Sequence, residues 1–208
     1  TVALLMARFY DPISGEILLD GISLKEWDIA WVRSFVGFVP QDVFLFSTSI
    51  SDNIRFGNDT LTQEAIEVAA KQADVYDNIM EFPDQFETIL GERGITLSGG
   101  QKQRVSIARA LVKNPKMLVL DDCLSAVDTH TEHTILENLK QVTVGKSSLI
   151  ISHRVSSARL ANRIFVLSEG AIIESGSHKE LMKKKSLYYE LYQQQLNEEL
   201  QQVSAQSN

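Results

Sequence analysis

Three short apolar runs with helical patterns between them constrain the fold of this chain more than any other feature of its sequence. The runs cover residues 117–120, 148–151 and 164–167, and Ser148 is their one polar member. Strands that are apolar at every position are typical of a parallel sheet with helices on both faces, because both faces of such a strand are buried. The chain of 208 residues is therefore predicted to form one α/β domain, with room for a subdomain.

Turn residues place two further strand segments. Residues 16–19 and 22–24 are predicted to be short strands around a hairpin turn at Asp20-Gly21. Residues 35–39 form another apolar run, which Pro40 ends. The N-terminal third of the chain therefore supplies strands as well as helices.

Between residues 49 and 104 the pattern is helical. Apolar residues recur at helical spacing from Thr60 to Met80, and Thr60 with Gln63 fits a capping box. We therefore expect helical structure over residues 60–80, within a helical segment that is separate from the strands around it.

The C-terminal part contains a predicted hairpin and a tail. Glu169-Gly170 is a turn that joins the run at 164–167 to residues 171–174, which we expect to form an antiparallel hairpin at an edge of the sheet. From Lys179 onward the pattern is helical, and the chain ends in a polar, Gln-rich stretch.

Composition excludes several classes of protein. The longest apolar run, residues 2–7, is far shorter than the roughly 18 residues of a membrane span. The net charge of -7 and the lack of a long basic block argue against nucleic acid as a partner. Cys123 is the only cysteine, so no internal disulfide can form, and a reducing compartment is predicted.

The strongest motif is the signature segment, residues 97–104, with the sequence Leu-Ser-Gly-Gly-Gln-Lys-Gln-Arg. The two glycines allow backbone amides to approach an anion without obstruction from a Cβ atom. Ser98 and Gln101 can cap the helix that follows, and the N-terminus of that helix would face a phosphate. An ordinary glycine turn before a capped helix would give the same pattern, so this motif alone does not establish a phosphate site.

A second motif covers residues 116–122 and ends in Asp121-Asp122. An acidic residue at the carboxyl end of a buried strand lies where α/β sheets bind ligands, and it can hold Mg²⁺ there. A pair of aspartates that only caps a loop is an equally good interpretation of this motif by itself.

Taken together, the motifs resemble the ATP-binding domain of an ABC transporter, in the order that this family has them. After the signature segment come residues 113–115, the strand with Asp121, the segment 125–128 and the triplet 152–154. Gln41 falls where this family has its Q-loop glutamine. Residues 91–94, Gly-Glu-Arg-Gly, are similar to the coupling segment of ABC exporters. The resemblance covers nearly the whole chain.

The resemblance implies an α/β fold with a P-loop NTPase core of the RecA-like type and an inserted helical subdomain. Residues 1–48 and 105–177 would form the core, and residues 49–104 would form the helical subdomain. Residues 178–208 would form a C-terminal helical tail.

The resemblance also implies a role for each matching residue in a site that takes ATP and Mg²⁺. Asp121 would assist Mg²⁺ binding, and Gln41 would contact Mg²⁺ or the attacking water and sense the membrane domain. His153 would donate a hydrogen bond to the γ-phosphate, although a histidine here could also be purely structural. Asp128 would connect two ATP sites across a dimer. The residues that would reach the γ-phosphate held by the partner domain are Ser98, Gly99, Gly100 and Gln101.

The N-terminus departs from the family pattern. The family's phosphate-binding loop ends Gly-Lys-Ser/Thr and opens a helix, and this sequence lacks it. Residues 1–5 resemble the continuation of that helix, and residues 1–8 are more apolar than a natural terminus usually is. We therefore expect a fragment that starts just after this loop, with the membrane helices in the part that precedes it.

Asp122 is the second departure, because this family usually has a catalytic glutamate at this position. Its side chain is one methylene shorter, and a displacement of about 1 Å can lower a rate on the order of a hundredfold. An intact signature beside a shortened carboxylate resembles one half of a heterodimeric bacterial multidrug exporter, in which one site hydrolyses ATP quickly and the other mainly holds it. The Gln-rich end, residues 192–202, is similar to the tail of such subunits.

The predicted function is that of an ATP-hydrolysing motor domain of an ABC exporter at the cytoplasmic face of a bacterial cell membrane. ATP-driven dimer closure with a second half-transporter would drive export. Three alternatives fit part of the pattern. A DNA-repair ATPase of this family needs long coiled coils, whereas only about sixty residues separate Gln41 from the signature segment. A nucleotide-gated scaffold is favoured by Asp122, and an importer is disfavoured by residues 91–94.

Overall fold

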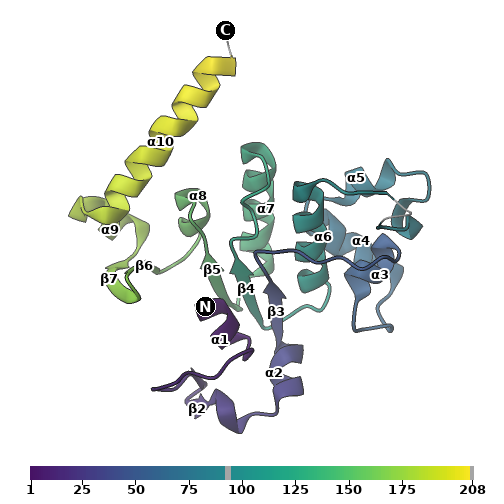
Figure 1. Ribbon diagram of the computed structural model, residues 1–208, viewed down its shortest axis with the longest axis horizontal. Helices are drawn as coiled ribbons and strands as arrows, with labels where there is room; N and C mark the ends of the chain where they lie inside the picture. The colour runs from purple at the N-terminus through teal and green to yellow at the C-terminus, as the bar shows by residue number, and fades with distance from the viewer. Residues whose placement is uncertain (92–94, 207–208) are drawn as a thin grey trace. The chain divides into compact units, whose positions relative to one another are not determined.

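The computed structural model describes residues 1–91 and 95–206, and the chain divides into two compact units, Thr1–Ile151 and Ser152–Asn208 (Figure 1). The elements of the first unit, in chain order, are α1 (Val2–Met6), β1 (Leu18–Leu19), β2 (Ile22–Ser23), η1 (Leu24–Glu26), α2 (Ile29–Phe35), β3 (Val36–Val39), α3 (Ile50–Arg55), α4 (Gln63–Gln72), α5 (Tyr76–Met80), η2 (Gln85–Glu87), α6 (Gly99–Leu111), β4 (Met117–Asp121), α7 (Thr129–Val142) and β5 (Ser147–Ile151).

A three-stranded parallel sheet in the order β3-β4-β5 forms the centre of the first unit. Its middle strand carries the first apolar run, and all four of those residues are buried. The parallel pairing and the burial of β4 on both faces are as predicted. β5 was expected to be equally buried, but its residues are half-buried or exposed. Within the described residues, β5 pairs only with β4, and this leaves its other edge uncovered.

Helices cover both faces of this sheet. Met117 and Val119 lie in one apolar cluster with Ala3 and Ala7, which brings α1 onto their face. On the other face the last turn of α6 comes so close to β3 that only glycine fits at position 37. A Cβ atom on Gly37 would lie 2.7 Å from Cγ of Pro115 and 3.0 Å from the carbonyl oxygen of Ala110.

The first predicted hairpin is confirmed with shorter strands. β1 and β2 pair antiparallel, and Leu19 lies opposite Ile22. Both turn residues have positive φ, 51° for Asp20 and 81° for Gly21. This is the conformation of a type I′ turn, whose twist matches that of the flanking strands.

The helical segment contains α3, α4, α5, η2 and the first turns of α6, and α3 and α4 both pack against α6. The helical pattern from Thr60 to Met80 is divided between two helices, because α4 ends at Gln72 and α5 begins at Tyr76. Asp74 lies between them with φ of 56°, a left-handed conformation that stops a helix. α6 runs unbroken from Gly99 to Leu111, across the boundary expected between residues 104 and 105.

The predicted capping box of Thr60 and Gln63 is wrong. Thr62 caps α4, and its side chain accepts a hydrogen bond from the amide of Ala65 at 3.3 Å. Thr60 bonds instead to Asn58, because its amide and its hydroxyl both donate to Oδ1 of Asn58. The cap therefore lies two residues further along the chain.

The second unit is described by itself. Its elements are α8 (Val155–Ala158), β6 (Ile164–Ser168), β7 (Ala171–Gly176), α9 (His178–Lys184) and α10 (Leu187–Gln206). β6 and β7 form an antiparallel hairpin, as predicted, and its turn residues Glu169 and Gly170 have φ of 49° and 80°. The expectation that β6 is a strand of a parallel sheet is wrong. Phe165 and Leu167 are 50% and 53% exposed, because β6 pairs only with β7 among the described residues.

A small apolar core holds the second unit together. Val155, Ile164, Val166, Leu181 and Tyr188 are buried in it, so it joins α8, the hairpin, α9 and α10. The predicted helical character of the chain from Lys179 is confirmed by α9 and α10. Among the residues described in both units, no helix is long and apolar enough to cross a bilayer.

Candidate functional site

The predicted cap of the signature helix is present. The hydroxyl of Ser98 accepts a hydrogen bond from the amide of Gln101 at 3.2 Å, and the side chain of Gln101 accepts one from the amide of Ser98 at 2.9 Å. These two bonds satisfy two of the donors that a helix start leaves unpaired. They fix Gly99 and Gly100 as the first helical residues of α6. The start of this helix is therefore held by contacts within the protein.

The signature segment lies against residues 125–128, which we term the D-loop segment after the family resemblance. A Cβ atom on Gly100 would lie 3.0 Å from the carbonyl oxygen of Ala126. The Gln103 side chain, only 6% exposed, accepts a hydrogen bond from the amide of Ala126 at 3.1 Å and donates one to the hydroxyl of Ser125 at 3.4 Å. The two segments therefore form one packed unit.

Sequence reasoning assigned no role to Gln103. A signal was present, because Gln103, Ile107 and Ala110 follow the i, i+4, i+7 spacing of one buried helix stripe. A polar residue in such a stripe requires a hydrogen-bond partner, since leaving a buried polar group unpaired costs about 1–3 kcal/mol.

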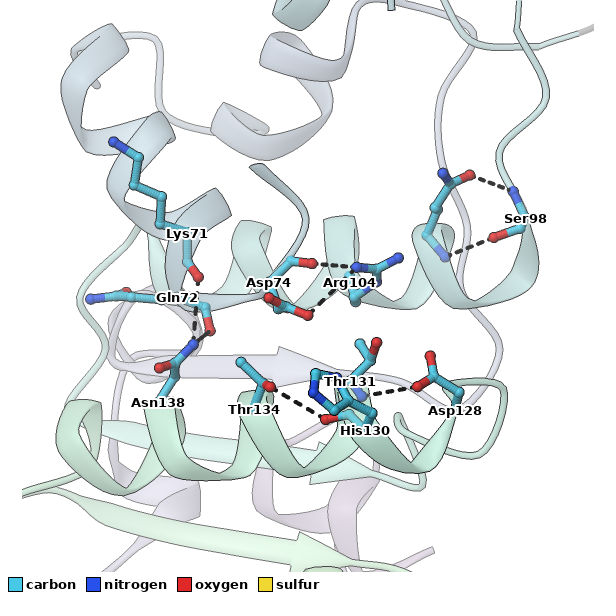
Figure 2. A network of polar contacts seen from close by, with 11 residues as sticks. Lys71, Gln72, Asp74, Ser98, Arg104, Asp128, His130, Thr131, Thr134 and Asn138 are labelled. Carbon is cyan, nitrogen blue, oxygen red and sulfur yellow. Dashed lines mark hydrogen bonds and ion pairs between the residues drawn. The ribbon is translucent and has the colours of Figure 1, made fainter. Parts of the chain in front are cut away.

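A second set of polar contacts joins α4, α6 and α7 (Figure 2). Arg104, the last signature residue, donates a hydrogen bond to the backbone carbonyl of Asp74 and lies 3.8 Å from the carboxylate of the same residue. Burial raises the pKa of Asp74, and the guanidinium of Arg104 opposes that effect. From α7, Asn138 donates to the carbonyl of Gln72 at 3.1 Å, at the C-terminal end of α4.

Asp128 is exposed and begins α7. Its carboxylate accepts a hydrogen bond from the amide of Thr131 at 3.0 Å, as Figure 2 shows. The hydrogen bond from that backbone amide, with a second from the Thr131 side chain, lowers the pKa of Asp128. Asp128 is therefore an N-cap with its charge at the positive end of the helix dipole.

Gln41, Asp121 and Asp122 follow strand ends at one edge of the parallel sheet. Val39 pairs with Leu120 in a parallel register, so the chain leaves β3 and β4 at the same carboxyl edge. Gln41 is exposed and Asp121 is half-buried. Among the described residues, no hydrogen bond or ion pair engages either side chain. The structure thus brings these polar groups to the edge where α/β sheets bind ligands.

The backbone of Asp122 is fixed on both sides. Its amide donates to the carbonyl of Ile151 at 2.8 Å, and its carbonyl accepts from the hydroxyl of Ser125 at 3.1 Å. Its φ of 47° is left-handed, an unusual conformation for a residue with a side chain. Asp122 is thus anchored to β5 and to the D-loop segment, and only its carboxylate remains without a partner among the described residues.

His153 belongs to the second unit and is exposed. Its carbonyl accepts a hydrogen bond from the side chain of Gln195 at 2.6 Å. No hydrogen bond of the described residues engages its imidazole.

The donor set at the sheet edge is compatible with Mg²⁺ but does not form a complete site. The oxygens of Asp121 and Gln41 are of the kind that Mg²⁺ prefers. Throughout residues 1–91 and 95–206, no group of three or more His, Cys, Asp or Glu side chains is placed to hold a metal ion. A cation at this edge would therefore take its other ligands from phosphate oxygens and water.

The structure describes only part of the predicted coupling segment, and it places Cys123 in a buried position. Of the predicted coupling segment, Glu92, Arg93 and Gly94 lie outside the described residues. Gly91 packs against Ser47, whose Oγ would lie 2.4 Å from an added Cβ atom. Burial raises the pKa of Cys123 to about 12, so its thiol stays protonated and unreactive.

Comparison with known proteins agrees with this geometry. The family model described as "ABC transporter" matches residues 1–125. The chain is 46% identical over 201 residues, 97% of its length, to ABC transporter B family member 4 of Dictyostelium discoideum. It is 47% identical over 196 residues, 94% of its length, to the mitochondrial potassium channel ATP-binding subunit of Pongo abelii. A solved bacterial Atm1-family ABC exporter with ATP bound superposes with a TM-score of 0.89 at 42% identity, and the match covers 94% of this chain and 34% of that one.

The chain spans about a quarter of the length of these curated relatives, 26% and 27% respectively. The match to the family model, residues 1–125, includes the signature segment and the strand that ends in Asp121. A family model that matches more than half of the chain and relatives this similar leave one assignment: the chain belongs to the ABC transporter family, as part of its ATP-binding domain.

Proposed function

We propose that this chain is the ATP-binding and ATP-hydrolysing motor domain of an ABC exporter, in which ATP-driven closure of two such domains drives transport. The observation that carries the proposal is the preformed start of α6, where the bonds between Ser98 and Gln101 hold Gly99 and Gly100 in place. Free amides and the positive end of the dipole of this 13-residue helix favour a phosphate there. Its relatives include an exporter solved with ATP bound.

The proposed site residues keep the roles that the family resemblance implies. Asp121 and Gln41 would hold Mg²⁺, which neutralises phosphate charge when it is bound. Asp122 would accept the proton of the attacking water, and His153 would contact the γ-phosphate. The residues that face the nucleotide of the partner domain are Ser98, Gly99, Gly100 and Gln101. Asp128, in the D-loop segment that packs on the signature, would connect the two nucleotides.

We further propose a second half-transporter as the partner, and a location at the cytoplasmic face of a membrane. Nucleotide sandwiched between the signature of one domain and the sheet edge of the other requires two domains. A heterodimer is supported by Asp122, because a shortened carboxylate leaves this chain's own site slow while its signature can serve a fast site. The relatives come from eukaryotes as well as from a bacterium, so a bacterial origin stays a prediction.

The scaffold alternative has one observation in its favour. The backbone of Asp122 is held by Ile151 and Ser125, so it cannot readily shift to make up for the missing methylene. A chain of this kind could hold ATP without turning it over.

Phosphate release from the complete transporter separates the possibilities. We expect Asp122→Asn to leave most of the activity, because a base already weakened about a hundredfold has little left to lose. Neutralising the carboxylate at the matching position of the partner half should abolish turnover. Equal and near-complete loss in both variants would show that Asp122 is an effective base and that the sites are symmetric. No turnover in the wild-type complex would favour the scaffold.

A further inference from the structure

The C-terminal helix α10 makes two direct hydrogen bonds to the segment that carries His153. The amide nitrogen of the Gln195 side chain donates to the carbonyl of His153 at 2.6 Å. Its carbonyl oxygen accepts from the backbone amide of Val155 at 2.7 Å. One side chain thus bonds to the backbone on both sides of Arg154, although 40 residues of sequence separate Gln195 from Val155.

An apolar contact and a further hydrogen bond hold α10 in this position. Tyr188, Tyr192 and Gln195 follow one another at i, i+4 and i+7, so they share a face of the helix. Tyr188 is buried in the core that also contains Val155, and Tyr192 packs against that core. A 2.9 Å hydrogen bond joins the hydroxyl of Tyr188 to Nδ1 of His178 in α9. These contacts of α10 therefore hold Gln195 next to the segment that carries His153.

The two bonds matter because they act at the start of α8, where the amide of Arg154 also donates to the hydroxyl of Ser152 at 2.9 Å. That helix has four residues, and its N-cap residue Arg154 makes no side-chain cap. The amide of Val155 would otherwise be an unpaired donor at a helix start. Gln195 supplies the missing cap and, through the same amide group, sets the orientation of the peptide that follows His153. The direction in which the exposed imidazole points depends on that orientation.

We propose that Gln195 is a positioning residue for His153, through which the C-terminal helix controls how this domain senses the γ-phosphate of ATP. This inference rests on the proposed function, in which His153 contacts that phosphate. It assigns to α10 a role in the nucleotide site, beyond that of a polar tail. Undocking of α10, for example by a partner protein that binds this helix, would weaken recognition of ATP without touching the nucleotide.

The experiment compares ATP with ADP on the complete transporter, assembled with its wild-type partner. Photoreactive analogues of ATP and ADP label each subunit separately, so apparent affinities can be measured for this subunit alone. We expect Gln195→Ala to weaken ATP binding roughly tenfold, the effect of one lost hydrogen bond to a charged group. ADP binding should change less than twofold, because ADP lacks the γ-phosphate. A merely structural role would weaken both nucleotides equally.

Three further variants sharpen the test. Gln194→Ala is the matched control, because among the described residues the Gln194 side chain bonds only to Glu198, on the surface of the same helix; it should leave both affinities unchanged. Gln195→Glu keeps the acceptor for Val155 but cannot donate to His153 when ionised, so it should show the loss for ATP with less disturbance of α10. In a His153→Ala background, Gln195→Ala should have no further effect on ATP, since both act through the same imidazole.

The remaining outcomes distinguish a failure of the proposed function from a failure of the positioning role of Gln195. If the wild-type subunit is labelled by neither analogue, the proposed function itself is wrong, and the inference falls with it. If His153→Ala shows the selective loss of ATP affinity and both Gln195 variants do not, the function stands and the positioning role is overturned. Additive effects of His153→Ala and Gln195→Ala would also overturn it.

Discussion

The signature region and the carboxyl edge of the sheet are both candidate nucleotide-binding surfaces, yet they differ in whether their polar side chains are hydrogen-bonded. In the signature region Ser98, Gln101 and Gln103 are bonded to one another or to the D-loop segment. At the sheet edge the side chains of Asp121 and Gln41 have no hydrogen-bond partner among the described residues. The polar side chains of the first surface are satisfied within the protein, whereas those of the second are left without a protein partner.

This difference has a thermodynamic consequence. A side chain that is already bonded inside the protein contributes to the free energy of unfolding, so its loss destabilises the domain. A side chain that has no partner inside the protein contributes mainly to the free energy of ligand binding. A bonded side chain that does not face the nucleotide, such as that of Gln103, should therefore affect stability, and the unbonded side chains of the sheet edge should affect affinity.

The largest effect is expected from Ser98→Arg in the complete transporter. It places a bulky cation where the nucleotide of the partner domain docks, so turnover should collapse by a hundredfold or more, as misplacement of reacting groups can cause. ATP should still bind to this subunit, because that contact lies in the other half of the sandwich. Ser98→Thr, which keeps a capping hydroxyl, is the control. Retention of half of the phosphate-release activity in Ser98→Arg would contradict the cross-dimer role of Ser98.

A smaller effect, on stability, is expected from Gln103→Leu. It leaves the amide of Ala126 without its acceptor and should lower the free energy of unfolding by about 1–3 kcal/mol. Urea denaturation measures this. The exposed Gln141→Leu on α7 should stay within about 0.5 kcal/mol of wild type. A similar small change for Gln103→Leu would mean that the D-loop segment is not held by this bond.

Asp121→Asn should show the reverse behaviour. We expect the affinity for Mg-ATP to fall roughly tenfold, equivalent to about 1.4 kcal/mol, while the free energy of unfolding stays nearly unchanged. Asp42→Asn, next to Gln41 on the same exposed loop, serves as the control. Loss of stability in Asp121→Asn comparable to that of Gln103→Leu would remove the distinction between the two regions.

The smallest effect concerns pH. The pKa of Asp128 is lowered in the folded protein, so its cap stabilises α7 at pH values above the unfolded pKa of about 3.9. That contribution is lost as the pH falls below 4 and through the folded pKa. The protection factors of the first amides of α7, which correct hydrogen exchange for its intrinsic pH dependence, should therefore fall over this range. Asp128→Asn keeps the acceptor without the titration, so the same fall in that variant would contradict the assignment.

Local sequence patterns predicted local features well and long-range features poorly. The capping box of Ser98 and the turns at Asp20-Gly21 and Glu169-Gly170 depend only on neighbouring residues, and all three are present. The break between α4 and α5 was missed because the residues around Asp74 include neither glycine nor proline. A backbone carbonyl there is held by Arg104, 30 residues away in sequence.

The same reasoning explains the outcome for strands and for the site. An apolar run predicts a strand but does not identify its partner, so β6 was assigned to the wrong sheet. Asp121 and Gln41 could be placed at one edge because the carboxyl ends of parallel strands coincide. The contacts of Gln103 and Gln195 could not be predicted, since each joins segments that only tertiary packing brings together.

The close approach of Gly100 to the carbonyl of Ala126 limits which mutations can compensate for a replacement at position 100. Any side chain at position 100 would press against the backbone carbonyl oxygen of residue 126. A smaller side chain at position 126 would leave that oxygen in place and would not relieve the contact. Second-site suppressors of Gly100→Ala should therefore not arise at Ala126 itself. They should arise where the path of the D-loop segment is set, and a genetic screen would thus trace which residues hold that loop.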